Sequence, residues 1–440
     1  SADQRAGRAG RTAPGRCVRL WTEREHQDRP VRELPEVKRL DLAEVVLTLK
    51  ASGVEDVNKF RWIDMPDARS LERALTLLTD LGALDEVGGL TEMGSRMLAF
   101  PVHPRYARML IEADRRGCVR EVAMVAALTQ GRSLVRRAEG RDMEQLRERL
   151  WGEEEKSDLS VLVQAQKFAE QEHFQVQRCR PLGIHAGAAR EAGALAKQFL
   201  QIAREEKLNI GPEPASSEAI LRCVLAGFPD QVAMRVDAGT LRCQLVHGRK
   251  GVLARESVVH RSPLLVACEV REVEGKGAEK QVLLTLASEI QEDWLRELFP
   301  EAMQQKTEVL FDATQKRVVA RNVLKFRDLT LRSKETDAVP SDEAALLLAD
   351  EVQAGRCVLK EWTDAVEQWI TRVNLVSEWQ PDWEIPPIGA EGRRLLLEQI
   401  CHGAISYREI RDRPVWPIVK SWLSPAQVDV VEKHAPERVE

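Results

Sequence analysis

The chain has 440 residues, a formal net charge of −5, 43% hydrophobic residues and 31% charged residues. This composition excludes a disordered chain, a collagen and a disulfide-stapled scaffold, and the length suffices for about three domains of about 150 residues. No apolar run approaches the ~20 residues of a membrane helix, so we expect a soluble protein.

The first eleven residues hold an unusual arrangement of arginine and glycine, Gln4-Arg5-Ala6-Gly7-Arg8-Ala9-Gly10-Arg11. In a helix, Gln4, Arg8 and Arg11 stand at i, i+4 and i+7 and share one face. Two forked cations at this spacing suit the charge on a transferring γ-phosphate. An arginine-rich surface helix is the simpler explanation, but glycines inside such a helix would weaken it without return. The pattern therefore favours a phosphate-binding face.

Amphipathic helices follow from Asp41. Leu42, Val45, Val46 and Leu49 define one apolar face, and a second helix begins near Asp67. After Gly88-Gly89, a short helix runs to Met97 with Thr91 as its N-cap. This order predicts a small winged-helix-like unit over residues 34–100. Helical patterns at 104–116, 118–129, 158–174 and 188–206 then predict a helical bundle over residues 101–208.

The periodicity changes to two beyond Phe228-Pro229. Alternating apolar residues predict five or more short strands, centred on these positions: Leu241 to Leu245, Val266 to Val270, Val282 to Leu286, and Phe326 to Leu331. We expect a small β-barrel over residues 218–331. A final helical region, 341–440, holds six of the ten tryptophans. The fold class is thus multidomain and mainly α-helical, with one β-barrel.

These segments resemble a known family. Gln4 to Arg11 matches motif VI of the DEAH-type superfamily 2 helicases, and Pro14 to Thr22 resembles the strand that closes their second RecA-like domain. Four further segments are similar to the family's winged-helix, ratchet and OB-fold entries: 34–42, Leu81–Asp85 with Leu90–Gly94, Phe100–Arg105 with Met109-Leu110, and Ala226–Ala233. The final tryptophan-bearing region most resembles the bacterial HrpB type.

The resemblance implies an ATP-dependent RNA helicase with ATP and Mg²⁺ as its cofactor. Residues 1–33 would be the end of the second RecA-like domain, and 341–440 an HrpB-type C-terminal domain. Gln4, Arg8 and Arg11 would face ATP, with Arg11 as the arginine finger, Arg8 beside it on the γ-phosphate and Arg5 facing away. Single-stranded RNA would run along the ratchet and the OB-fold.

Two motor motifs are absent from the sequence. It contains no G-x-x-x-x-G-K-[ST] and no D-E-x-H box. The nearest string, Ser341-Asp342-Glu343, is better explained as a helix N-terminus with acids at its positive dipole end. Because the chain also opens Ser1-Ala2-Asp3 without an initiator Met, we expect it to be the C-terminal part of a longer helicase and to be inactive alone. The alternative is a non-catalytic nucleic-acid-binding or scaffold protein that retains only the accessory domains.

Four basic residues in the barrel region are candidate RNA contacts: Arg249, Lys250, Arg255 and Arg261. A basic loop between strands can follow phosphates without reading bases, although an ordinary solvated hairpin tip has the same composition. The predicted recognition helix around Glu92 to Met97 carries only Arg96, which disfavours a sequence-specific DNA-binding regulator.

The remaining composition says less about function, namely the tryptophans, the arginine excess, the cysteines and the histidines. The six late tryptophans fill a core or line a partner-docking groove. Of the 65 basic residues, 48 are arginine and 17 lysine, an excess that GC-rich coding bias largely explains. The eight cysteines form no C-x-x-C pair, which indicates reduced thiols and a cytoplasmic protein. No metal-ligand spacing occurs, so we predict no metal site.

Overall fold

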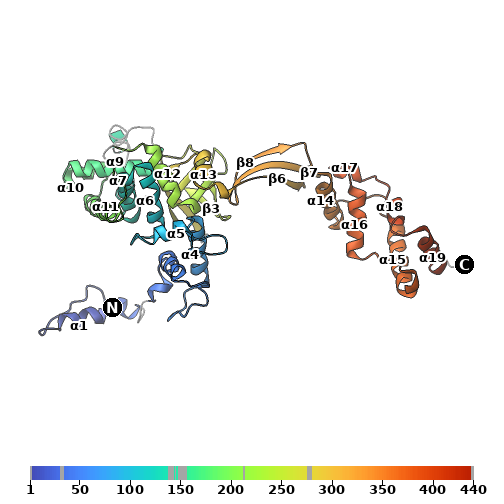
Figure 1. Ribbon diagram of the computed structural model, residues 1–440, viewed down its shortest axis with the longest axis horizontal. Coiled ribbons are helices and arrows are strands. Elements are labelled where there is room, and N and C mark those ends of the chain that lie inside the picture. Colours follow the sequence, from blue (N-terminus) through green and yellow to red (C-terminus); the bar gives the residue numbers. More distant parts are fainter. Residues whose placement is uncertain are drawn as a thin grey trace. The chain divides into compact units, whose positions relative to one another are not determined.

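The computed structural model describes residues 2–29, 34–136, 143, 145–146, 156–211, 214–274 and 280–437. The chain divides into two compact units, Ser1–Trp294 and Leu295–Glu440, which are described separately. Elements carry their labels in Figure 1. Within the described residues, every helix is too short or too polar to cross a membrane.

In the N-terminal segment, residues 2–29, an irregular stretch separates two short helices. Its two helices are α1 (Ala2–Ala9) and α2 (Glu23–Gln27), the second with a complete capping box between Thr22 and Glu25. The expected strand at 14–22 is wrong for this chain, because those residues are irregular. Val18 and Leu20 in this stretch are 77% and 91% exposed. Such exposure of apolar side chains is typical of a segment without a core of its own.

The next region follows the expected winged-helix order. Its elements are η1 (Glu36–Lys38), α3 (Ala43–Ala51), α4 (Ala68–Asp80) and α5 (Glu92–Met97). The Thr91 side chain accepts the Gly94 N–H at 3.0 Å, which confirms the predicted cap of α5. A bridge between Leu84 and Leu90 closes a short hairpin ahead of that helix. The predicted apolar face of α3 is right at Leu42 and Val46, but Val45 is exposed.

Four helices confirm the helical patterns predicted for the bundle: α6 (Pro104–Arg116), α7 (Val119–Gln130), α9 (Asp158–Gln171) and α11 (Ala186–Glu205). The short elements α10 (Val176–Cys179) and η2 (Arg180–Leu182) were not predicted. Helix α12 (Ser217–Gly227) lies where we expected the barrel to begin, so the predicted start of the barrel at residue 218 is wrong. Helix α6 begins with Pro104 and ends before Gly117, whose φ of +68° suits a left-handed C-terminal position. Helices α6 and α12 pack closely, because a Cβ on Gly227 would lie 2.5 Å from Met109 Cγ.

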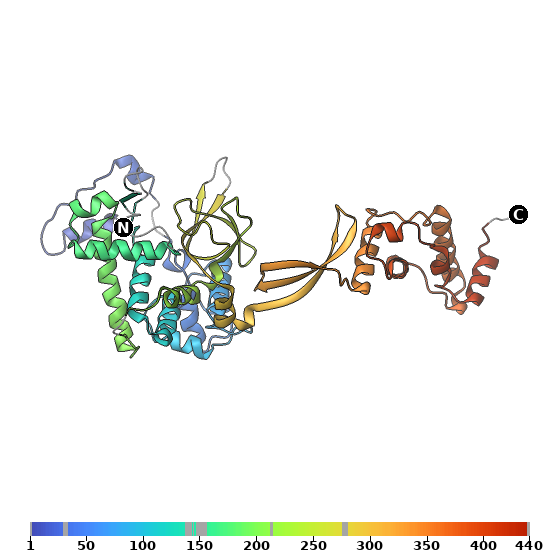
Figure 2. The same cartoon turned by 90° about the horizontal axis from the view of Figure 1, so that it is seen from above.

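Five strands form the predicted barrel, which is closed in the order β1-β2-β3-β5-β4 (Figure 2). They are preceded by η3 (Pro229–Gln231) and comprise β1 (Val232–Arg235), β2 (Arg242–Leu245), β3 (Lys250–Leu253), β4 (Leu264–Glu274) and β5 (Lys280–Glu289). Only the β3–β5 pairing is parallel. Inward residues such as Leu245, Leu265 and Leu284 fill its interior. Helix α13 (Glu292–Leu298) follows.

Phe326 and Leu329 to Leu331, which we expected to form one strand of the barrel, lie on two strands joined by a turn at residues 327–328. Both strands belong to a separate three-stranded antiparallel sheet in the second unit, drawn in orange in Figure 2. Its elements are η4 (Pro300–Ala302), β6 (Met303–Asp312), β7 (Arg317–Phe326) and β8 (Leu329–Thr336). The barrel therefore ends at Glu289, well before the expected residue 331.

Helices complete the second unit. They are α14 (Ser341–Gln353), α15 (Asp364–Trp379), η5 (Pro381–Trp383), α16 (Ala390–Cys401), α17 (Tyr407–Ile410), α18 (Trp416–Lys420) and α19 (Pro425–His434). Helix α14 confirms the interpretation of Ser341 to Glu343 as a helix N-terminus with acids in its first turn, although no side chain caps it. Trp369 belongs to the core of this unit.

Candidate functional site

The predicted phosphate-binding residues lie on or just beyond α1. Gln4 and Arg8 share one face of the helix, as expected, and both are exposed. Arg11 lies two residues after the helix ends, so the structure does not extend the common face to it. A Cβ on Gly7 or Gly10 would meet no atom within 4 Å. Internal packing therefore does not require glycine at these two positions.

The candidate RNA contacts separate into two kinds. Lys250, Arg255 and Arg261 are exposed on the barrel. Arg249 turns inward instead and donates to the carbonyl oxygens of Val246 and Asp230. Arg249 is thus committed to the barrel's own structure, whereas the other three guanidinium and ammonium groups face solvent.

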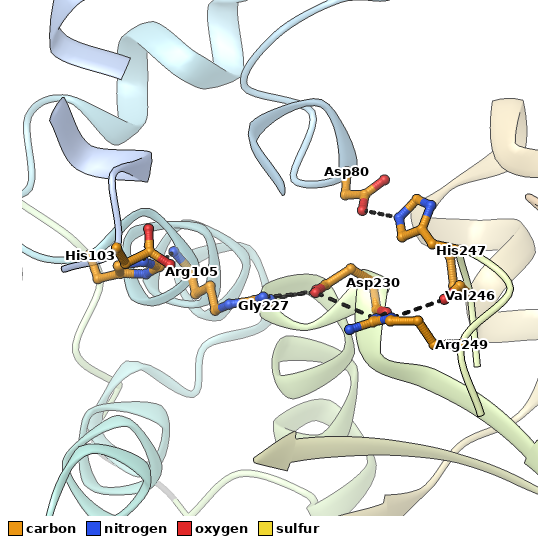
Figure 3. Close-up of polar contacts among 9 residues, drawn as sticks. Asp80, His103, Arg105, Gly227, Asp230, Val246, His247 and Arg249 are labelled. Atoms are coloured by element: carbon orange, nitrogen blue, oxygen red, sulfur yellow. Dashed lines mark hydrogen bonds and ion pairs between the residues drawn. The ribbon is translucent and has the colours of Figure 1, made fainter. Parts of the chain in front are cut away.

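The inward turn of Arg249 leads to a polar junction that the sequence did not single out (Figure 3). Its centre is a bidentate pair, in which Arg105 Nη1 and Nη2 donate to Asp230 Oδ1 and Oδ2 at 2.6 and 2.8 Å. Arg105 Nη1 also donates to the Gly227 carbonyl at 3.0 Å, and its guanidinium lies 4.9 Å from the Phe228 ring centroid. We call Arg105, Asp230 and Arg249 the Asp230 junction. It joins α6 to the start of the barrel.

Charge compensation makes burial of this junction tolerable. The side chains of Arg105 and Asp230 are only 13% and 12% exposed. Burial by itself would raise the pKa of Asp230, but Arg105, assisted by Arg249, lowers that pKa below its ordinary value. Burial opposes the charge on Arg105 as well, and Asp230 outweighs it, so the pKa of Arg105 is raised. Both groups are therefore ionised at neutral pH.

A four-residue turn brings the winged-helix region to the same place. Val246 to Arg249 connects β2 to β3, and its central residues His247 and Gly248 both have a φ of +63°, in the left-handed region that tight turns use. His247 Nε2 lies 2.7 Å from Oδ2 of Asp80, a buried residue at the end of α4. The turn thus contacts the winged-helix region through His247 and Asp230 through Arg249 (Figure 3).

A second contact joins the winged-helix region to the bundle. His103 Nε2 lies 3.4 Å from Asp41 Oδ1. The hydrogen bond from His103 lowers the pKa of Asp41, which also accepts the Ala43 N–H at 2.8 Å near the start of α3. His103 itself precedes α6, two residues before Arg105.

A separate set of hydrogen bonds joins the start of α9 to the segment after β3 and to β5. Asp158 accepts the N–H groups of Val258 and Ala287 at 2.9 and 2.8 Å and the Ser257 hydroxyl at 3.0 Å. We call these four residues the Asp158 junction. Burial raises the pKa of Asp158, and the hydrogen bonds offset that effect only in part. The hydroxyl groups of Ser157 and Ser288, 2.7 Å apart, extend this junction.

Comparison with known proteins gives these domains a family. Residues 74–102 match the winged-helix helicase-associated domain (HA2), and residues 103–175 match its ratchet-like domain. The chain is 34% identical over 253 residues to "Probable ATP-dependent RNA helicase DHX35" of Pongo abelii and 33% identical over 252 residues to the Homo sapiens protein of that name. Each match covers 55% of this chain and 34% or 35% of the relative, so the chain spans about a third of these relatives' length.

Solved structures show the same fold. Two crystal structures of E. coli HrpB, described as a DExH-box NTPase and as a DEAH/RHA helicase, each align with a TM-score of 0.50 over 99% of this chain. The alignments cover 48% and 49% of those chains at 23% and 21% identity. At this identity they show a shared fold, and the matched HA2 domains bear out the helicase resemblance seen in the sequence. The chain therefore contains the winged-helix and ratchet-like helicase-associated (HA2) domains.

Proposed function

We propose that this chain is the C-terminal part of an ATP-dependent RNA helicase that couples ATP hydrolysis to translocation on, or remodelling of, single-stranded RNA. The observation that carries the proposal is the order of the matched helicase-associated domains at 74–175 behind a motif VI-like segment at Gln4 to Arg11. The two DHX35 relatives bear the name of probable ATP-dependent RNA helicases.

The assignment of the remaining regions belongs to this proposal. We assign the segments in chain order to the end of a second RecA-like domain, the winged helix, the ratchet, an OB-fold-like barrel and an HrpB-type C-terminal domain: 1–33, 34–100, 101–208, 218–331 and 341–440. Within the fourth segment, β1 to β5 alone would form the OB-fold-like barrel.

The ATP-facing role rests on the N-terminal arginines. Gln4, Arg8 and Arg11 would hold the γ-phosphate, and Mg²⁺ with the other phosphates would be bound mainly by a P-loop and a DExH box elsewhere in the intact protein. Exposed guanidinium groups beside glycines that no internal packing requires fit such an external ligand. Bound ATP supplies the phosphoryl group that is transferred to water. The arginines would stabilise the charge that develops on it.

The RNA-binding role rests on the exposed basic groups of the barrel. Lys250, Arg255 and Arg261 present cations to solvent, and they would contact phosphates without reading bases. Arg249 would support this surface from inside, through Asp230. The two junctions, which join the barrel to α6 and to α9, would let these parts move together during ATP turnover.

The decisive experiment measures RNA-stimulated ATPase activity of the intact protein with Arg11→Ala. We expect kcat to fall at least about a hundredfold, since an arginine finger contributes about 10³ to 10⁵ in rate. The free energy of unfolding should not change, because Arg11 is exposed. Arg24→Ala on α2, also exposed, is the matched control and should retain activity.

Two results would argue against this proposal. Unchanged turnover in the Arg11 variant would remove that residue from its role. An intact protein without ATPase activity and without a P-loop would instead favour the alternative, a non-catalytic nucleic-acid-binding or scaffold protein built from helicase accessory domains.

A further inference from the structure

Tryptophans on α15 and just after it stand in contrasting surroundings. Trp369, in the first half of the helix, is 3% exposed. The Arg372 guanidinium lies 5.1 Å from its ring centroid, and the Lys420 ammonium lies 5.6 Å from it. Cations over an indole face are attracted by the electron density of the ring. The chain therefore supplies its own cations to Trp369.

The other end of the helix presents its rings to solvent. Trp379, the last residue of α15, is 56% exposed, and Trp383, at the end of η5, is 47% exposed. Trp379 lies ten residues after Trp369, which is about 15 Å further along the helix axis at 1.5 Å per residue. Leu375, one turn earlier on the same face, is exposed as well. Large aromatic side chains of this kind are enriched where proteins bind partners.

The loop that carries Trp383 is held in a fixed conformation. Four side chains hydrogen-bond to its backbone: Asn374, Ser377, Trp422 and Gln427. The Gln427 amide donates to the carbonyl oxygens of both Trp383 and Glu384, at 3.2 and 3.3 Å. Glu384 adopts a φ of +46°, a region that non-glycine residues rarely occupy. A loop ordered in advance presents its ring with little further loss of conformational freedom on binding.

The charged residues in the segment that carries these rings are all acidic. The segment from 373 to 392 contains no Lys, Arg or His. It contains three exposed acids beside the tryptophans: Glu378, Asp382 and Glu384. Carboxylates at the edge of an aromatic surface repel the phosphates of RNA and attract cations. The surface therefore complements a basic peptide and not a nucleic acid.

We propose that Trp379 and Trp383, with Glu378, Asp382 and Glu384, form a docking surface for an arginine-rich segment of a partner protein. Arginine guanidinium groups would stack on the two indoles, as Arg372 does on Trp369, while the acids pair with the same cations. Arginine suits this role better than lysine because its planar group stacks on aromatic faces and forks to carboxylates.

The test measures binding of fluorescein-labelled nona-arginine to the full chain by fluorescence anisotropy. We expect Trp379→Ala with Trp383→Ala to weaken binding about tenfold, because both indole faces that attract the guanidinium cations are lost. The triple variant Glu378→Gln, Asp382→Asn and Glu384→Gln should also weaken binding and reduce its dependence on salt. Nona-lysine should bind the wild-type chain more weakly than nona-arginine.

A charge-matched control separates this surface from general attraction to an acidic chain. Three exposed acids elsewhere in the same unit are neutralised: Asp337→Asn, Glu343→Gln and Glu361→Gln. This control should bind nona-arginine as the wild type does. Circular dichroism checks the fold of each variant. If the tryptophan double variant does not fold, the acid triple variant, which keeps both tryptophans, still tests the surface.

Two outcomes would overturn the proposal. One is equal affinity for nona-arginine in the wild type, the tryptophan double variant and the acid triple. The other is that the tryptophan variant no longer binds a labelled 12-nucleotide oligouridine while its binding of nona-arginine is unchanged. That result would identify a nucleic-acid stacking surface instead.

Discussion

The Asp230 and Asp158 junctions connect the same barrel to helices by opposite electrostatic means. Asp230 is matched by the full charges of Arg105 and Arg249, and its pKa is lowered. Asp158 is matched only by N–H and hydroxyl dipoles, and its pKa is raised. A carboxylate removed from water thus stays readily ionised next to a guanidinium, while neutral donors compensate its burial only in part.

The sharpest way to break this comparison is to remove the carboxylate at the charged junction. Asp230→Ala would leave Arg105 enclosed without its partner, and we expect the free energy of unfolding of the Ser1–Trp294 unit to fall by about 3 to 5 kcal/mol. Urea denaturation measures it. Arg8→Ala, which removes an exposed arginine, should change it by no more than about 0.5 kcal/mol. Equal effects of the two substitutions would contradict the structural role of Asp230.

The same truncation at the uncharged junction should cost less. Asp158→Ala leaves the Val258 and Ala287 N–H groups without their acceptor, and an unsatisfied buried group costs about 1 to 3 kcal/mol. We expect a loss of about 2 to 3 kcal/mol in urea denaturation. Asp158→Asn, which keeps one carbonyl acceptor, should recover part of it. A larger loss of unfolding free energy for Asp158→Ala than for Asp230→Ala would contradict the expected order of the two junctions.

The pH dependence of stability should have opposite signs at the two sites. The lowered pKa of Asp230 means that its contribution is present above the unfolded-state pKa and is lost as pH falls through the folded-state value. The raised pKa of Asp158 means that its contribution is present at low pH and is lost as pH rises through the folded-state value.

Unfolding of each Asp→Asn variant, measured against the wild type between about pH 3 and 7, reports these slopes. The advantage of the wild type over Asp230→Asn should grow with rising pH, whereas its advantage over Asp158→Asn should shrink. Parallel slopes would show that the two carboxylates do not differ in the way described.

The smallest expected effect separates neighbours on one hairpin. Arg249→Ala should lower the free energy of unfolding by about 1 to 2 kcal/mol, because its hydrogen bonds to the Val246 and Asp230 carbonyls are lost. Lys250→Ala should leave stability within about 0.5 kcal/mol and reduce RNA affinity at low salt. Thermal unfolding and RNA titration distinguish them. RNA binding lost with Arg249 alone would contradict the assignment of the exposed residues.

Local patterns predicted the helices well because the signals are local. Pro104, the apolar spacing and Gly117 lie within one helix length, so both ends of α6 agree with the sequence. The apolar residues from Phe326 to Leu331 correctly indicated β-structure, but they belong to two strands, β7 and β8, with a turn between them. The pattern could not assign these strands to a sheet, because alternation reports which side of a strand is buried and not which strand pairs with it.

The candidate site was only partly predictable for the same reason. The Gly-flanked turn and its basic residues were visible in the sequence, but the inward direction of Arg249 depends on Asp230, nineteen residues away. Arg105 and Asp230 lie in segments that resemble the family, but no local pattern showed that Asp230 is buried or that Arg105, 125 residues away, is its partner.

The turn from Val246 to Arg249 carries two contacts only two residues apart, one from His247 to Asp80 in the winged-helix region and one from Arg249 to Asp230. Most surface hairpins tolerate an inserted residue, because only their own strands sense the change. Here one added residue would displace His247 from Asp80 and Arg249 from Asp230 together. Variation in length, which is harmless at most loop tips, would at this one require simultaneous changes in the winged-helix region and in the barrel.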